Sequence, residues 1–550
     1  MLKRFIATCL VLPLLLAALL AVPARSWATS PPAAQDFRMS QFAVTAGSSV
    51  SLHWNTGANQ FFFLTSTAPT FLPKFSSSSV VTWPQGSRAS WNGTYNWWRT
   101  TSGAVMVAIP ADAAPGTTYA FQLYTCDSSS NLCSNSADRS GDSHVTLTVA
   151  AKWTTTSYKN DFSTASVVSQ VTGHPLDVVF SPDDIIWNSS EFSDSLGKLS
   201  IGAGLKSYVD PTDTGTDPFA YCFSNCRPAS ASSALSEQII YANGLIWFTQ
   251  GGWPFYDCSV SHSQRTCPPN HSEVVAFNPT TNNFCSYLVP GDNNEVMGLA
   301  ATGTAPDDDI WFVESNIEGG KPNLDYFNPA EVGDGCPGTT SESYSLSGLV
   351  HRIIWPGNNF PSQIAVDPSG SALWVSDFWG SSIARVDLRT HVITSHHLAS
   401  HNSYSFFGSD PWQVAADANY VYAIDYGDSN LDRINKKTGH VDQVSIPLLS
   451  DTERGYGLAI SGSRLYFTLS DDDRPSFGYA STVGYVDIGT WAASSPSPTT
   501  AVVYTGLSEV TDPTSSNVDF RGIAASSDGL LAIADLANVI RLSPRGLSQG

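Results

Sequence analysis

The feature that most constrains this chain is an internal repeat that runs from about residue 174 to residue 545. Each copy holds three short apolar segments, and a tight turn such as Asp367–Gly370 separates the first segment from the second. The first segments recur every 44 to 65 residues. They are Leu176–Phe180, Gln238–Tyr241, Gly298–Ala301, Gln363–Val366, Gln413–Ala416, Gly457–Ile460 and Gly522–Ala525. Seven copies of this kind predict an all-β fold, a seven-bladed β-propeller over residues 151–550.

The seventh copy ends soon after its third segment, so its blade lacks an outer strand. Residues 153–160 precede the first copy, and we expect them to fill this gap and close the ring without a free edge. A β-solenoid is the competing architecture, but it needs shorter and more regular periods.

Residues 37–150 show a different pattern, that of a β-sandwich. Val50–Trp54 and Val145–Val149 alternate apolar and polar residues, and Tyr119–Tyr124 is a Tyr/Phe strand. The pattern resembles bacterial immunoglobulin-like domains. The Trp residues of this region fit either a packed core or a stacking platform for sugar rings. They are Trp54, Trp83, Trp91, Trp97 and Trp98.

The first 28 residues have the organisation of a signal peptide. Lys3 and Arg4 form a positive segment, Phe5–Val22 is apolar, and Ser26–Ala28 supplies small residues for cleavage. The apolar run also has the length of a short membrane span, so an uncleaved anchor is the alternative. Either way, the chain is predicted to be exported, as a secreted, cell-surface or periplasmic protein.

The cysteines agree with export. Cys9 lies in the signal segment, and the other eight are an even number that includes three close pairs, each around a polar loop, which is typical of disulfides in an oxidising compartment. A zinc site is the competing interpretation of the closest pair, which has three residues between its cysteines. The predicted disulfides are Cys126–Cys133, Cys222–Cys226, Cys258–Cys267 and, by elimination, Cys285–Cys336.

The charge limits the partners. With 27 Lys and Arg against 48 Asp and Glu, the formal net charge is −21. Nucleic acids and anionic lipids need clustered basic residues, so both are excluded as partners. No other apolar stretch is long enough to cross a bilayer. We expect a monomer that binds a small molecule, a glycan or a protein.

The repeat copies resemble known propellers. Pro361–Asp377 followed by Ile383–Asp387 is similar to the blades of the NHL-repeat group and of virginiamycin B lyase, also called streptogramin lyase. Asn293–Ala300 with Ile310–Ser315 is close to the lyase-type blade. The resemblance implies a propeller and a His/Glu group with a magnesium ion on one face. Of the seven positions that precede a first segment, only His174 is a histidine.

Blade geometry places the candidate catalytic residues on one face. Residues that precede the first strand and residues that follow the second strand lie together at the channel mouth. There, Glu314 and His174 are candidate acid–base groups, and Asp377, Asp425 and Asp535 are candidate ligands of a divalent Mg or Ca ion. The alternative for each Asp is a turn-capping role.

The same face offers candidate binding residues. Trp412, Tyr456 and Arg521 precede first strands, and Trp253 and Tyr256 lie in a long loop. Aromatic side chains at a channel mouth are typical of a ligand site. Our first hypothesis is an exported binding protein. The alternative is an enzyme, a divalent-metal-dependent lyase or lactonase of the streptogramin-lyase type.

Overall fold

A computed structural model describes nine strands and residues 109, 113 and 117 within residues 35–149. It then describes residues 153–546 with short gaps. The gaps are residues 171–174, 191–194, 201–203, 210–237, 251–271, 291–294, 304–307, 316–320, 333–339, 358–359, 399–408, 428–429, 447–452, 472–480, 492–497, 499, 508–518 and 536–537.

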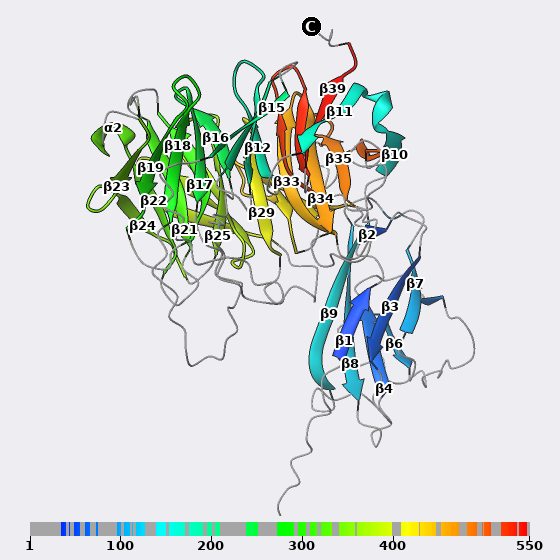
Figure 1. Ribbon diagram of the computed structural model, residues 1–550. Coiled ribbons are helices and arrows are strands. Elements are labelled where there is room, and N and C mark those ends of the chain that lie inside the picture. Colours follow the sequence, from blue (N-terminus) through cyan, green and yellow to red (C-terminus); the bar gives the residue numbers. More distant parts are fainter. Residues whose placement is uncertain are drawn as a thin grey trace, which may run out of the picture.

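Residues 153–546 form a seven-bladed β-propeller (Figure 1). The strands of each blade are given from the innermost outward. Blade 1 is β12 (Pro175–Phe180), β13 (Ile186–Ser190), β14 (Ser195–Ser200) and β15 (Gly204–Val209). Blade 2 is β16 (Ile239–Ala242), β17 (Leu245–Gln250), β18 (Glu273–Asn278), β19 (Asn283–Leu288) and β23 (Glu342–Ser345). Blade 3 is β20 (Glu295–Thr302), β21 (Asp309–Ser315), β22 (Asn323–Phe327) and β24 (His351–Ile354).

The remaining four blades follow in chain order. Blade 4 is β25 (Pro361–Val366), β26 (Ala372–Asp377), β27 (Ser382–Asp387) and β28 (Ile393–His397). Blade 5 is β29 (Pro411–Ala416), β30 (Tyr420–Asp425), β31 (Asn430–Asn435) and β32 (Val441–Ser445). Blade 6 is β33 (Glu453–Ser461), β34 (Arg464–Asp471), β35 (Thr482–Asp487), β36 (Ala501–Thr505) and β10 (Trp153–Ser157). Blade 7 is β37 (Phe520–Ala525), β38 (Leu531–Asp535), β39 (Asn538–Pro544) and β11 (Phe162–Gln170). Neighbouring strands within the blades are antiparallel, except that β23 pairs parallel with β19 and β10 pairs parallel with β36.

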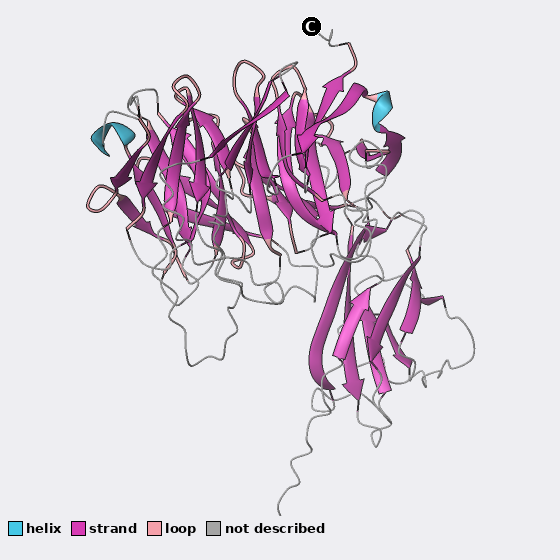
Figure 2. Ribbon diagram, viewed as in Figure 1, coloured by secondary structure: helices cyan, strands magenta, loops and turns pink. Residues whose placement is uncertain are grey.

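The inner strands contact one another in order, and β37 of the last blade contacts β12 of the first, which closes the ring. Strands dominate the fold, and the helical turns α2 (Pro329–Val332) and η3 (Tyr158–Asn160) are short (Figure 2). Among the described residues, no helix is long and apolar enough to cross a membrane.

The ring closes through a different strand from the one that the sequence predicted. β11 pairs antiparallel with β39, from Phe162 opposite Pro544 to Gln170 opposite Asn538. The prediction that residues 153–160 fill this position was therefore wrong. They contribute β10, which adds a parallel fifth strand to β36 of blade 6. An N-terminal segment still covers the edge of the last blade, as a closed ring requires.

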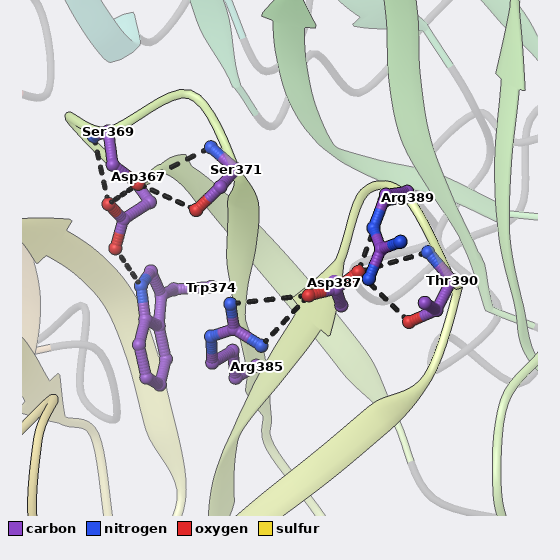
Figure 3. A network of polar contacts seen from close by, with 8 residues as sticks. All are labelled: Asp367, Ser369, Ser371, Trp374, Arg385, Asp387, Arg389 and Thr390. Carbon is purple, nitrogen blue, oxygen red and sulfur yellow. Dashed lines mark hydrogen bonds and ion pairs between the residues drawn. The ribbon is translucent and has the colours of Figure 1, made fainter.

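In blades 3 and 4, a Trp residue of the second strand holds the inner hairpin at the end that carries the tight turn. Trp374 is buried and donates its indole N–H to Asp367 at 2.9 Å (Figure 3). Trp311 donates to Thr302 in the equivalent way at 2.8 Å. Burial raises the pKa of Asp367, but hydrogen bonds from Lys436, Trp374 and Ser369 outweigh it and hold the pKa below its usual range. The recurrence of this turn in the copies is therefore explained by its role in stabilising the hairpin.

The nine strands before residue 150 form two further sheets. One has the order β1 (Gln35–Met39), β3 (Ser49–Asn55), β7 (Ala104–Ala108) and β5 (Pro73–Lys74). The other has the order β2 (Ala43–Val44), β9 (Arg139–Val149), β8 (Thr118–Cys126), β4 (Phe61–Ser66) and β6 (Asn96–Thr100). The immunoglobulin-like character of residues 37–150 and the domain boundaries stay predictions.

Candidate functional site at the channel mouth

The start of each inner strand lies beside the end of the second strand of its blade. Pro361 pairs with Asp377, Pro411 with Asp425, and Phe520 with Asp535. The residues that the sequence assigned to one face therefore share one end of the blades. This end is called the channel mouth below.

A β-bulge bends the inner strand just below the channel mouth in six of the blades, for example between Pro175 and Val178. A bulge leaves backbone groups without their ladder partners. Side chains of the preceding blade bind some of these groups. Gln238 accepts from the N–H of Leu299 at 2.7 Å, and Gln413 accepts from that of Leu458 at 2.6 Å. The result is a ring of polar side chains around the channel.

Gly522 occupies the same position in blade 7, because no side chain fits there. A methyl group at Gly522 would lie 2.6 Å from the Cα atom of Asp177, closer than carbon atoms normally approach. We predict that Gly522→Ala lowers the free energy of unfolding by about 1–3 kcal/mol through overpacking. Denaturant unfolding of the variant measures this change. An unaltered midpoint would show that the blade 7–blade 1 contact tolerates a side chain.

Six aromatic side chains from blades 4–6 meet at the channel mouth, and we call them the aromatic collar. They are Phe360, Phe378, Trp379, Trp412, Tyr426 and Tyr456. Trp412 lies at the centre, with its ring 5.6 Å from that of Phe378 and 5.8 Å from that of Tyr456. Trp412 and Tyr456 are buried, whereas Phe378, Trp379 and Tyr426 are half-buried. The collar is thus an apolar surface at the point where the channel opens.

Arg521 extends the collar into blade 7. Its guanidinium lies 5.0 Å from the centre of the Tyr456 ring, a cation–π arrangement. The Nε atom also donates to Asp519 at 3.0 Å, so this cation is already paired. The sequence predicted Trp412, Tyr456 and Arg521 as binding residues, and the structure brings all three together.

A small cavity lies directly below the collar. Its volume is about 10 Å³, which is close to the minimum that holds one water molecule. It is lined by Leu176, Asp177, Gln363, Trp412, Gln413, Tyr456 and Gly522. The cavity therefore has room for a group about the size of a water molecule.

Asp177 is the carboxyl group of this cavity. Burial raises its pKa to about 7, although the backbone N–H groups of Val178 and Ile239 donate to it and oppose the shift. Sequence reasoning missed this residue because it lies inside an apolar segment. The available signal was its place in the repeat, where other copies carry Gln238, Gln363 or Gln413.

The three candidate metal ligands each bond to the backbone of their own blade. Asp377 accepts from the N–H of Gly380 at 3.1 Å and from the indole of Trp355 at 3.1 Å. Asp425 accepts from the N–H of Asp410 at 3.0 Å. Asp535 accepts from the N–H of Asp519 at 2.9 Å. These contacts are those of turn and strand caps.

Glu314 is buried inside blade 3 and does not face open solvent. Arg352 forms ion pairs with both Glu314 and Asp325, the second at 3.0 Å. Burial and the neighbouring Asp325 raise the pKa of Glu314 to about 8, against the opposing effect of Arg352. Burial also raises the pKa of Asp325. The two carboxyls therefore favour sharing one proton beside the guanidinium.

Several predicted residues lie outside the described residues. They are His174, Trp253, Tyr256, Cys133, Cys222, Cys226, Cys258, Cys267 and Cys336. Of the other cysteines, Cys126 ends β8 and Cys285 on β19 is disulfide-bonded. The predicted pairing of Cys285 with Cys336 stays a prediction. Within the described part of the chain, no group of three or more His, Cys, Asp or Glu side chains could hold a metal ion.

The comparisons with known proteins find similar solved structures but no family. No protein-family model matches this chain, and no curated protein matches its sequence. Among solved structures, a streptogramin B lyase is similar over 71% of this chain and 100% of its own, with 15% identity and a TM-score of 0.48. A catalytically inactive virginiamycin B lyase from Staphylococcus aureus with quinupristin is similar over 69% of this chain and 99% of its own, with 13% identity and a TM-score of 0.46.

A third neighbour is a different kind of propeller. YCF48 bound to a D1 peptide is similar over 69% of this chain and 94% of its own, with 10% identity and a TM-score of 0.42. Streptogramin lyase propellers and a peptide-bound propeller are thus both structural neighbours of this chain. Its own sheets define it as a seven-bladed β-propeller. A fold of this kind carries many functions, so function has to be argued from the site.

Proposed function

We propose that this chain is an exported binding protein, whose propeller binds its ligand at the channel mouth through the aromatic collar. The observation that carries the proposal is the convergence of six aromatic side chains from three blades around one opening. Folding alone would bury such rings between the blades. Here Phe378, Trp379 and Tyr426 are half-buried at the channel mouth, which suits contact with a small molecule, a glycan or a peptide.

Two features support export. The first 28 residues have the pattern of a signal peptide. Cys285 is disulfide-bonded, which is typical of proteins from oxidising compartments.

We do not extend the proposal to a lyase or lactonase. That alternative needs Glu314 and the three aspartates to act at a common point around a divalent ion. In the described residues, Glu314 pairs with Arg352, and Asp377, Asp425 and Asp535 cap backbone N–H groups of their own blades. These residues do not fit a shared metal, so no catalytic step is derived from them. The divalent ion stays an untested prediction.

The test is a binding screen with a matched pair of variants. A panel of small molecules, glycans and peptides is screened by thermal shift against the wild type, and hits are measured by calorimetry. We expect Trp379→Ala, in the collar, to weaken every hit by about tenfold or more, as loss of an aromatic contact does. The control is Tyr326→Ala, a half-buried aromatic on β22 that stacks on Trp311 outside the collar.

Tyr326→Ala should bind the hits as the wild type does. Hits whose affinity is equal in the wild type and in both variants would place binding elsewhere and overturn the proposal.

A further inference from the structure

The cavity below the collar is lined by aromatic side chains and by a carboxyl group. Two of its sides are the aromatic residues Trp412 and Tyr456, and its polar side includes the carboxyl of Asp177. Asp177 is 7% exposed, and each of its oxygens accepts one backbone N–H, Oδ1 from Val178 at 2.9 Å and Oδ2 from Ile239 at 3.2 Å. A carboxylate oxygen accepts more than one hydrogen bond, so Asp177 retains acceptor capacity toward the cavity.

No cation of the described residues balances this carboxyl. The shift in its pKa comes from burial and from two backbone hydrogen bonds, without a contribution from Lys, Arg or His. The charged groups on the strands that pack against β12 are Arg521 on β37 and Asp535 on β38. Arg521 is bound by Asp519. A buried carboxylate without a counter-ion is costly, and a bound cation removes that cost.

We propose that the channel mouth recognises a primary alkylammonium group, which enters the cavity beside Trp412 and Tyr456 and donates hydrogen bonds to Asp177. This inference rests on the proposed function, since the collar surrounds the alkyl chain that carries the group. An ammonium tip is close to water in size and so fits a cavity of about 10 Å³, whereas a ring does not. Aromatic walls stabilise a cation through their negative faces.

The net charge of −21 supports the same ligand, because an acidic protein attracts cations and raises their rate of association. The ammonium could belong to a free diamine or to a lysine side chain of a peptide. Both sources present the same chemistry to Asp177, and the experiment separates them.

The experiment is calorimetry on the full chain with 1,5-diaminopentane, and with 1,5-pentanediol as a neutral probe of the same length. We expect the diamine to bind about tenfold more tightly than the diol, because only the diamine neutralises Asp177. Asp177→Asn should bind the diamine about tenfold more weakly and the diol unchanged. The matched control is Asp432→Asn, which alters an equally buried carboxyl outside the cavity and should bind both probes as the wild type does.

A lysine probe separates the two sources. N-acetyl-lysine methylamide carries a single ammonium on a peptide-like backbone. If it binds more tightly than the diamine, the lysine side chain of a peptide is the ligand group. If the diamine binds more tightly, a free amine is.

A second measurement holds even if Asp177→Asn does not fold. Because the ammonium binds the ionised carboxyl, and the pKa of Asp177 is about 7, the wild-type affinity for the diamine should fall about tenfold between about pH 8 and pH 6. The diol should show no such change.

Equal binding of the diamine and the diol would overturn the ammonium inference and leave the collar as a site for neutral ligands. If Trp379→Ala binds every hit of the screen as tightly as the wild type does, the proposed function itself is overturned.

Discussion

Phe162→Ala is expected to lower the free energy of unfolding of the propeller by about 3–5 kcal/mol. Phe162 begins β11, the strand that completes blade 7, and its side chain is 2% exposed. Its ring packs edge-on against Tyr504 of blade 6 at 5.5 Å. One side chain thus joins the last blade, the N-terminal closing strand and the neighbouring blade. A typical domain has only about 5–15 kcal/mol of stability, so the loss is large.

Urea unfolding followed by tryptophan fluorescence measures this loss. The control on the same strand is Ser166→Ala, whose side chain is exposed and which should change the stability by less than about 0.5 kcal/mol. A comparably small effect of Phe162→Ala would show that β11 is not needed to hold the ring closed.

The blades could be predicted because their signal is local. Each copy repeats an apolar strand, a tight turn and a second apolar strand within about 20 residues, and in four copies the second strand carries a buried Trp. The closing strand could not be predicted in the same way. β11 contains few large apolar residues and pairs with residues almost 400 positions later, whereas the sequence favours residues 153–160 only because they precede the first copy. Such a pairing depends on how the ring closes rather than on the segment itself.

Only some residues of the channel mouth could be predicted, namely those whose position the repeat defines. Trp412, Tyr456 and Arg521 precede inner strands, so their place in the repeat put them at the channel mouth. Phe378 and Trp379 follow a second strand, in a loop whose path the repeat does not define. The role of Asp425 was open because a metal ligand and a backbone cap need the same carboxylate. In the structure, the N–H of Asp410 donates to the Oδ1 atom of Asp425 at 3.0 Å and the hydroxyl of Ser409 donates to its Oδ2 atom, which favours the cap.

Burial of carboxyls leads to the second large effect, a loss of stability as the pH rises. Burial raises the pKa of Asp177 and that of Asp432 from 3.8 to about 7. Asp432 accepts one hydrogen bond from Gln443 at 2.7 Å on Oδ1, and its buried Oδ2 atom has no hydrogen-bond partner. Both geometries favour the neutral acid in the folded protein.

The sign follows from proton counting. Between pH 3.8 and about 7 the folded chain keeps protons on these two groups, and the unfolded chain releases them. The stability is therefore highest at the acidic end of this range and falls as the pH rises through it. From about pH 5 to about pH 8, the ionisation of each group is expected to lower the free energy of unfolding by about 2–3 kcal/mol, since one pKa unit corresponds to about 1.4 kcal/mol. Glu314, whose pKa is raised to about 8, acts in the same direction.

Thermal and urea unfolding at the two pH values test this prediction, with Asp432→Asn as the informative variant. Because asparagine does not ionise, the variant should lose about 2–3 kcal/mol of the pH dependence, while the part due to Asp177 remains. A wild type that is equally stable at both pH values would mean that water or a bound cation solvates these carboxyls. For Asp177, that cation would be the ammonium ligand proposed above, so the pH dependence should shrink when 1,5-diaminopentane is added to the wild type but not when it is added to Asp177→Asn.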